Sequence, residues 1–274
     1  MAPSSSSNTP TSSITSTICV VCISDTYNAT PIVPAGDVLI HAGDLTQSGT
    51  ADEVRSAVRW IASLPHPVKI VVAGNHDKAL DKAFCNRELL DHCEIDWAAS
   101  GITFLEHSGT QITIRGRTLT VFGSPFTPEY GNWAFQYPQP KLLPARARDV
   151  WASISHHVDI LVTHGPPQGH MDTVGSQHVG CVALLERLQD IKPVLHVFGH
   201  VHAGRGVQTL RWDPAQKVSG WSIKNLRSGM LSAIPLLSRR DSTVEYRVTT
   251  LLVNASIQAG NRDAGLNDPE VVHI

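Results

Sequence analysis

Short apolar segments alternate with helical patterns along the chain after residue 17. Continuous runs of four to six residues rich in Val and Ile are typical of strands that are buried on both faces of a sheet. The runs are Ile18–Ile23, Val38–Ala42, Val68–Ala73, Leu119–Phe122, Val158–Val162 and Val194–Phe198. They predict a largely parallel core sheet.

Helical patterns lie between these segments. In Thr50–Leu64 the apolar residues fall on one helical face, and Thr50 and Glu53 have the spacing of a capping box. Asp77–Leu90 and Val179–Leu188 are also predicted to be helices. Alternation of strands and helices over the whole length predicts an α/β domain.

The first 17 residues differ in composition from the rest of the chain. Residues 1–17 include seven Ser and four Thr but no charged residue, and they predict a disordered tail. The pattern of a signal or transit peptide is missing, so we expect a cytoplasmic protein. We therefore divide the chain into a tail at 1–17 and one domain at 18–274, with an expected insertion at 209–242.

Charge and composition narrow the possible partners. The formal net charge is −2, so the chain has no broad basic field for nucleic acid or for an anionic membrane surface. The longest unbroken apolar stretch, Ile18–Ile23, is far too short to span a membrane. The 14 histidines are many for a nearly neutral protein. Several of them lie where metal ligands are expected.

Five apolar segments are followed directly by residues of metal-ligand type. These residues are Asp25, Asp44, Asn75 with His76, His164, and His200 with His202. Ligands of open α/β sheets collect at the carboxyl ends of the strands, so we expect these side chains to converge. Carboxylate, amide and imidazole groups together suit Mn, Fe or Zn better than Ca.

The order of these motifs resembles that of the calcineurin-like metallophosphoesterases, between residues 18 and 257. The motifs are Asp25–Thr26, Gly43–Asp44, Gly74–Asp77, Thr163–Pro167 and Gly199–His202. The resemblance is greatest to a branch of small enzymes from animals and fungi that act on cyclic nucleotides, which also has runs like Gly123–Pro125, Trp133–Phe135 and Asn254–Ser256. It implies two stacked mixed β-sheets flanked by helices, with a two-metal centre at one edge.

The resemblance also implies a role for each ligand. Asp44 would bridge two divalent metal ions, because each carboxylate oxygen can bind one of them. Asp25 and His202 would complete the first site. The second site would contain Asn75, His164 and His200. A water between the metals would be the nucleophile of an in-line phosphoryl displacement.

Other residues are assigned to catalysis and substrate. The resemblance makes His76 the general acid that protonates the leaving oxygen, with Asp77 orienting its ring. Arg205, beside two glycines, is a candidate phosphate contact, and His170 is a candidate lining residue of the substrate pocket.

Tyr27 departs from the family pattern. The family's first motif is Asp-x-His, whereas this chain has Tyr27 in the position of the histidine. Two interpretations remain open. Tyr27 packs beside the centre and the first metal is loosely held, or Tyr27 is a phenolate ligand to Fe(III).

The sequence therefore predicts an enzyme that hydrolyses phosphoesters through a metal-activated water. The resemblance favours a small phosphodiester, with nucleotides as the first candidates. One alternative is a phosphatase that acts on phosphoproteins or other phosphomonoesters. Another is a non-catalytic protein that binds a metal or a nucleotide through a degraded first site.

Overall fold

The computed structural model describes residues 17–140, 142–213, 248–259 and 265–274. The predicted tail at 1–17 lies outside this range except for Thr17, and residues 214–242 of the predicted insertion also lie outside it. Residues 209–211 belong to a strand. The predicted insertion therefore overlaps the end of this strand.

The first sheet has five strands. In sheet order they are β15 (Glu270–His273), β1 (Cys19–Ile23), β2 (Val38–Ala42), β3 (Val68–Val72) and β4 (Thr103–Phe104). Strands β1 to β4 are parallel, and β15 runs antiparallel to β1 at the edge. Three of these strands are apolar segments predicted from the sequence.

The second sheet has six strands, of which the central four are parallel and the two edge strands antiparallel. In sheet order they are β13 (Gly206–Arg211), β14 (Thr249–Asn254), β12 (Leu195–Phe198), β9 (Ile160–Thr163), β6 (Arg117–Ser124) and β5 (Ser108–Ile114). Two short pairs are β7 (Thr127–Pro128) with β8 (Gln136–Tyr137), and β10 (Thr173–Val174) with β11 (Gln177–His178).

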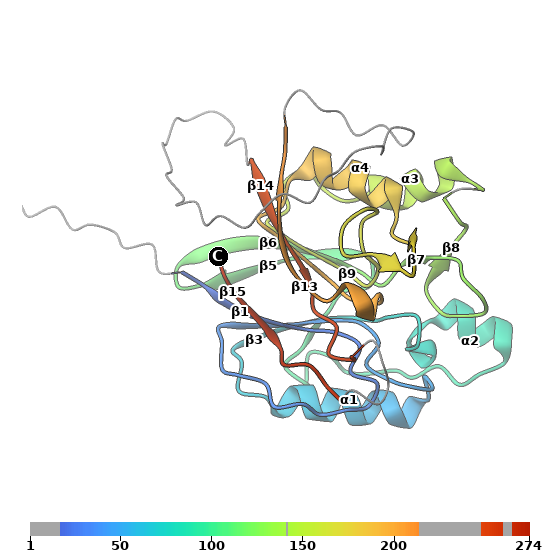
Figure 1. Cartoon of the computed structure of the whole chain (residues 1–274). Helices are drawn as coiled ribbons and strands as arrows, with labels where there is room; N and C mark the ends of the chain where they lie inside the picture. The colour runs from blue at the N-terminus through green and yellow to red at the C-terminus, as the bar shows by residue number, and fades with distance from the viewer. Residues whose placement is uncertain (1–16, 141, 214–247, 260–264) are drawn as a thin grey trace, which may run out of the picture.

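Helices cover the outer faces of the two sheets (Figure 1). They are α1 (Ala51–Ser63) and α2 (Lys82–Glu88) beside the first sheet, and α3 (Pro144–Ala152) and α4 (Val182–Ile191) beside the second. The short 3₁₀ helices η1 (Lys78–Leu80) and η2 (His202–Gly204) follow β3 and β12 in the chain. The largest apolar cluster lies between the sheets and includes Val72 of β3 and Val121 of β6. This layered arrangement confirms the expected fold class.

The ends of the helices follow from their capping residues. Thr50 caps α1 through the predicted capping box with Glu53. Asp77–Leu90 is not one helix as predicted, because Asp81 ends η1 and caps α2. Helix α4 begins three residues later than predicted, because the Cys181 sulfur accepts a hydrogen bond from the backbone of its first turn.

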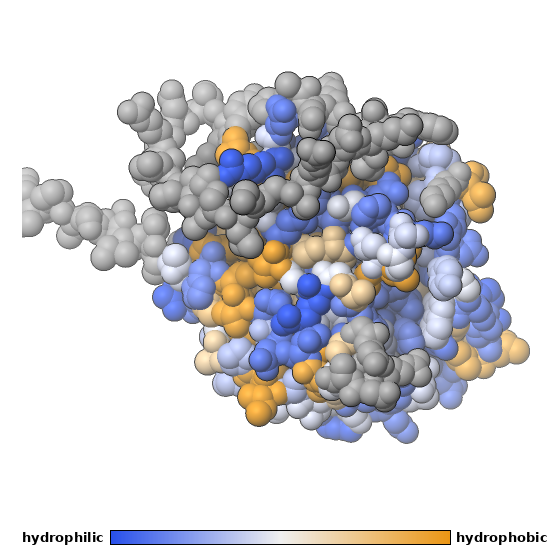
Figure 2. Space-filling model, in the orientation of Figure 1, coloured by the Kyte–Doolittle hydropathy of each residue, from blue (hydrophilic) through white to orange (hydrophobic). Residues whose placement is uncertain are grey.

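On the face drawn in Figure 2, apolar residues form patches among polar residues. Within the described part of the chain, every helix is too short or too polar to span a bilayer.

Candidate metal centre

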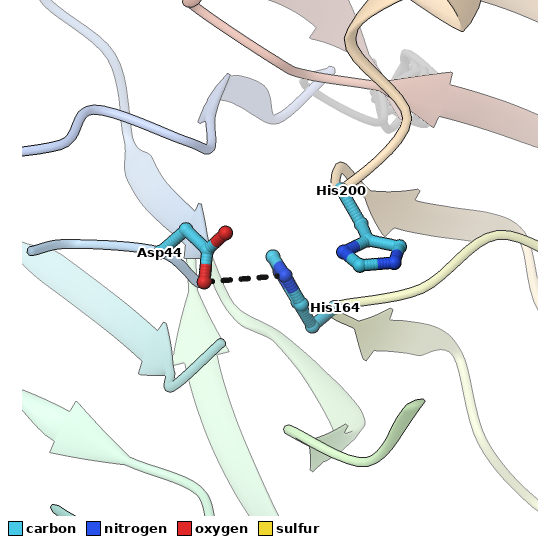
Figure 3. Close-up of side chains that lie close together, drawn as sticks. All are labelled: Asp44, His164 and His200. Carbon is cyan, nitrogen blue, oxygen red and sulfur yellow. Dashed lines mark ion pairs between the residues drawn. The ribbon is translucent and has the colours of Figure 1, made fainter. Parts of the chain in front are cut away.

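The predicted metal ligands converge where the two sheets meet at the carboxyl ends of their strands. Asp44 follows β2, His164 follows β9 and His200 follows β12. The ligand atoms of these three side chains all lie within 4.8 Å of one another. Figure 3 shows the Asp44 carboxylate and the His164 ring facing each other, with His200 beside them. Residues from three strands and both sheets thus form one cluster.

The backbone at the centre is strained. Asp25, Asp44 and His200 adopt left-handed conformations, with φ of 57°, 55° and 66°. Such angles are uncommon outside glycine and cluster at functional sites. A Cβ atom at Gly74 or Gly199 would collide with a carboxylate of the centre. Only glycine allows these segments of the chain to approach each other so closely.

The arrangement around His164 fits a metal ion. His164 Nδ1 donates to the Ala42 carbonyl oxygen at 2.9 Å, because a carbonyl can only accept. Its Nε2 lies 3.1 Å from Asn75 Oδ1 and 3.3 Å from Asp44 Oδ1. A neutral ring would therefore present a lone pair beside two oxygens. A divalent cation among these atoms satisfies all of them, and the donor set suits Mn, Fe or Zn.

The electrostatics of the buried cluster agree with that fit. Burial alone would raise the pKa of Asp44, but His164 more than offsets it and holds the pKa below its usual range. Burial alone would lower the pKa of His164, but Asp44 raises it to about 9, so a metal ion bound here would displace a proton from this ring. Burial, aided by His164, lowers the pKa of His200 to about 4, so this ring is neutral near pH 7 and able to bind a metal.

The other part of the centre contains Asp25, His202 and Tyr27. Asp25 accepts hydrogen bonds from the His200 backbone N–H at 3.0 and 3.1 Å, and its Oδ1 lies 3.5 Å from His202 Nε2. The Tyr27 hydroxyl donates to Asp44 Oδ2 at 2.8 Å and lies 3.0 Å from His202 Nε2. Burial, Asp44 and Asp25 raise the pKa of Tyr27 well above its usual value. In the protein alone this group is a phenol.

His76 lies at the edge of the cluster. Its Nδ1 donates to the Gln47 carbonyl oxygen at 2.8 Å, which leaves Nε2 as the nitrogen available for proton transfer. The ring stacks on Trp133 with 4.3 Å between centroids and meets the Tyr27 ring edge-on at 4.9 Å. The orientation of His76 is therefore fixed by one backbone carbonyl and two aromatic rings.

The role expected for Asp77 needs correction. Its buried carboxylate accepts hydrogen bonds from the backbone N–H groups of Leu45 at 3.2 Å, Thr46 at 2.9 Å and Gly74 at 2.7 Å, and from the Thr46 hydroxyl at 2.7 Å. These contacts fill its acceptor positions, so Gln47 rather than Asp77 orients His76. Burial and the Asp44 charge raise the pKa of Asp77 to about 6. Asp77 joins the loop after β2 to the loop after β3.

We expect Asp77→Ala to destabilise the protein by about 3 kcal/mol, because several buried donors lose their only acceptor. Urea unfolding measures the change, with Asp52→Ala as the matched control since the Asp52 side chain is 95% exposed. A loss below about 1 kcal/mol for Asp77→Ala, the net value of a single ordinary hydrogen bond, would contradict this role.

The two residues expected to contact substrate have partners within the chain. Arg205 Nη2 donates to the Asp268 carbonyl oxygen at 2.7 Å and lies 2.8 Å from Glu270 Oε1, so its charge is paired. His170 is buried, with Nδ1 at 3.3 Å from Gln208 Oε1. Both residues hold the segments around η2 together.

Two residues next to His76 were not assigned a role from the sequence. Gln47 acts through its backbone carbonyl, which leaves no signal in the side-chain pattern. Trp133 belongs to a Trp-Ala-Phe run that the sequence shares with the family, and Lys78 Nζ lies 4.5 Å from the centre of its ring. That run was the available signal for Trp133.

Two stacked mixed sheets with a buried cluster of carboxylate, amide and imidazole groups at their strand ends define an α/β sandwich with a candidate metal centre. The family model described as calcineurin-like phosphoesterase matches residues 20–204, and the chain belongs to this family. The match covers the candidate ligands from Asp25 to His202 and confirms the resemblance found in the sequence.

Curated relatives come from fungi and animals. The chain is 43% identical over 201 residues to "Probable rhamnogalacturonate lyase C" of Emericella nidulans, which covers 72% of this chain and 18% of that protein. It is 39% identical over 208 residues to human "Metallophosphoesterase domain-containing protein 1", which covers 68% of this chain and 61% of the human protein. The chain thus matches less than two thirds of the length of either relative.

Solved structures resemble the chain more distantly. Phosphopantetheinyl hydrolase from Mycobacterium tuberculosis is 17% identical, with a TM-score of 0.48 over 88% of this chain and 89% of that one. A purple acid phosphatase from yellow lupin is 15% identical, with a TM-score of 0.39 over 94% of this chain and 46% of that one.

Proposed function

We propose that the protein is a metal-dependent hydrolase of phosphoesters, and that its substrate is a small phosphodiester. The observation that supports this most is the convergence of Asp44, Asn75, His164 and His200 beside His76 in a chain of this family. A protein that only bound a metal would not need a histidine with a fixed ring at the edge of the centre. Cyclic nucleotides are the first candidates within the proposed substrate class.

Different residues of the chain would bind the metal and donate the proton. Asp44, Asn75, His164 and His200 would hold the metal, and a cation bound there supplies Lewis acidity for the phosphoryl oxygen and for the attacking water. His76 would donate a proton from Nε2 to the leaving oxygen, because its Nδ1 proton is already donated to Gln47. The stacked Trp133 ring limits rotation of His76 and shields one of its faces.

A comparison of substrates and metals tests this proposal. We expect dialysis against a chelator to abolish hydrolysis, and Mn²⁺ or Zn²⁺ to restore it, because the carboxylate and imidazole groups require a cation to act on phosphate. The assay compares bis(p-nitrophenyl) phosphate, a cyclic nucleotide, p-nitrophenyl phosphate and a phosphoserine peptide. We expect turnover of the two diesters to exceed that of the two monoesters by at least about tenfold.

The outcomes separate the alternatives. Faster turnover of a monoester would show that the protein is a phosphatase and not a phosphodiesterase. Metal binding without turnover of any of the four substrates would favour the non-catalytic alternative. Full activity after chelation would contradict metal dependence itself.

The proposed setting is the cytosol. All five cysteines are free thiols, and four of them are buried. Free thiols are typical of a reducing compartment. This observation supports a location in the cytosol and is independent of the proposed chemistry.

A further inference from the structure

The two oxygens of Asp44 divide the centre into two halves. Oδ1 accepts from the His76 backbone N–H at 2.8 Å and lies 3.3 Å from His164 Nε2. Oδ2 accepts from the Tyr27 hydroxyl at 2.8 Å. We define the inner half as Asp44 Oδ1, Asn75, His164 and His200. The outer half is Asp44 Oδ2, Asp25 and His202.

One hydroxyl contacts all three side chains of the outer half. The Tyr27 oxygen lies 2.8 Å from Asp44 Oδ2, 3.0 Å from His202 Nε2 and 3.5 Å from Asp25 Oδ1. These are hydrogen-bond distances, and the hydroxyl stands among the atoms that would have to bind a cation in this half. A protonated phenol is a poor metal ligand, so the outer half does not fit a metal while the hydroxyl keeps this position.

The chain holds Tyr27 in this position. The Tyr27 backbone N–H donates to the Asp44 carbonyl oxygen at 3.2 Å, and the Asn28 N–H donates to the Leu45 carbonyl oxygen at 2.9 Å. The Asn28 side chain is itself bound to Glu53 at 2.7 Å. The Tyr27 ring packs edge-on against His76 and His202. Withdrawing the hydroxyl would break several of these contacts together.

We propose that the Tyr27 hydroxyl takes the place of a cation in the outer half, so that the chain retains one tightly bound metal ion, in the inner half. The inference rests on the proposed metal-dependent function and changes the number of ions that serve it. Asp25 and His202 would then position Tyr27 and the strand ends around Asp44. The neutral hydroxyl supplies Asp44 Oδ2 with a hydrogen bond where a second metal would supply charge.

The test counts metal ions. The full chain is loaded with Mn²⁺, dialysed against metal-free buffer and analysed for metal per protein. We expect one Mn per chain in the wild type and in Tyr27→Phe, which removes the hydroxyl but adds no ligand. Tyr27→His supplies an imidazole, and we expect it to retain two ions, with the second bound at least about tenfold more tightly than in the wild type. Tyr130→Phe is the matched control, since Tyr130 is 80% exposed.

A second measurement needs no variant. Electron paramagnetic resonance of the Mn-loaded wild type should show isolated ions, without the exchange coupling of two ions that share a carboxylate. Coupled ions or two retained Mn in the wild type would overturn the inference, and so would Tyr27→His that folds and still retains one. A visible phenolate-to-iron absorption band in Fe(III)-loaded wild type would also overturn it. Failure of the wild type to retain any metal would instead contradict the proposed function.

Discussion

Asp44→Asn is expected to lower metal affinity by more than about 100-fold and to reduce phosphoesterase activity to background. Loss of a partner outside the ligand shell already costs about 10- to 100-fold, and Asp44 lies at the centre of the ligand cluster itself. The amide has no negative charge, and its NH₂ group would face either the Tyr27 hydroxyl or the His164 ring.

Asparagine is the most informative substitution at this position, because it removes the charge and preserves the backbone conformation. Asp44 has φ of 55°, and asparagine tolerates the left-handed region better than most other residues, so the turn after β2 should persist. Metal content and turnover are measured together with the far-ultraviolet circular dichroism spectrum. Asp52→Asn, the same chemical change at an exposed site, is the control. A folded Asp44→Asn protein with normal metal content would show that the metal binds elsewhere.

His76→Ala is expected to reduce turnover by about 10² to 10⁴, the usual contribution of a positioned proton donor, while metal content stays unchanged. The loss should be largest for substrates with a poor leaving group and smallest for nitrophenyl esters, because a good leaving group departs without a proton. Steady-state rates on both kinds of ester measure this difference.

Two observations keep this experiment interpretable. The His76 side chain also bonds to Gln47 and stacks on Trp133, so the melting temperature of the variant must be compared with that of the exposed control His92→Ala. Loss of metal from folded His76→Ala would mean that the side chain is a ligand. An equal loss on every ester would mean that it does not protonate the leaving group.

The positions of the candidate ligands were predictable because strand ends leave a strong pattern. A buried strand such as β2 is a continuous apolar run, and the first polar residue after it marks its carboxyl end. Asp44, His164 and His200 could therefore be assigned to one edge. Helix α3 left a weaker pattern, because only Ala147 and Trp151 of its nine residues are buried.

The hydrogen bonds within the centre were not predictable. Asp77 follows His76 in the chain, yet its carboxylate turns to the backbone of two loops. Tyr27 has φ of 45°, a conformation that residue preferences do not favour, and this turn is what lets its hydroxyl reach Asp44. Such contacts depend on the packing of segments far apart in sequence.

The pairing of β1 with β15 affects how the protein is made. Cys19 lies opposite His273 and Cys22 opposite Glu270, so two strands that are far apart in the chain are neighbours. A ribosome delivers β1 before β15, so this edge of β1 stays open until residues 270–273 emerge. Until then the strand that leads to Asp25 exposes unpaired N–H and C=O groups, which favour association with other chains. Nascent chains stopped before residue 270 should therefore depend most on chaperones.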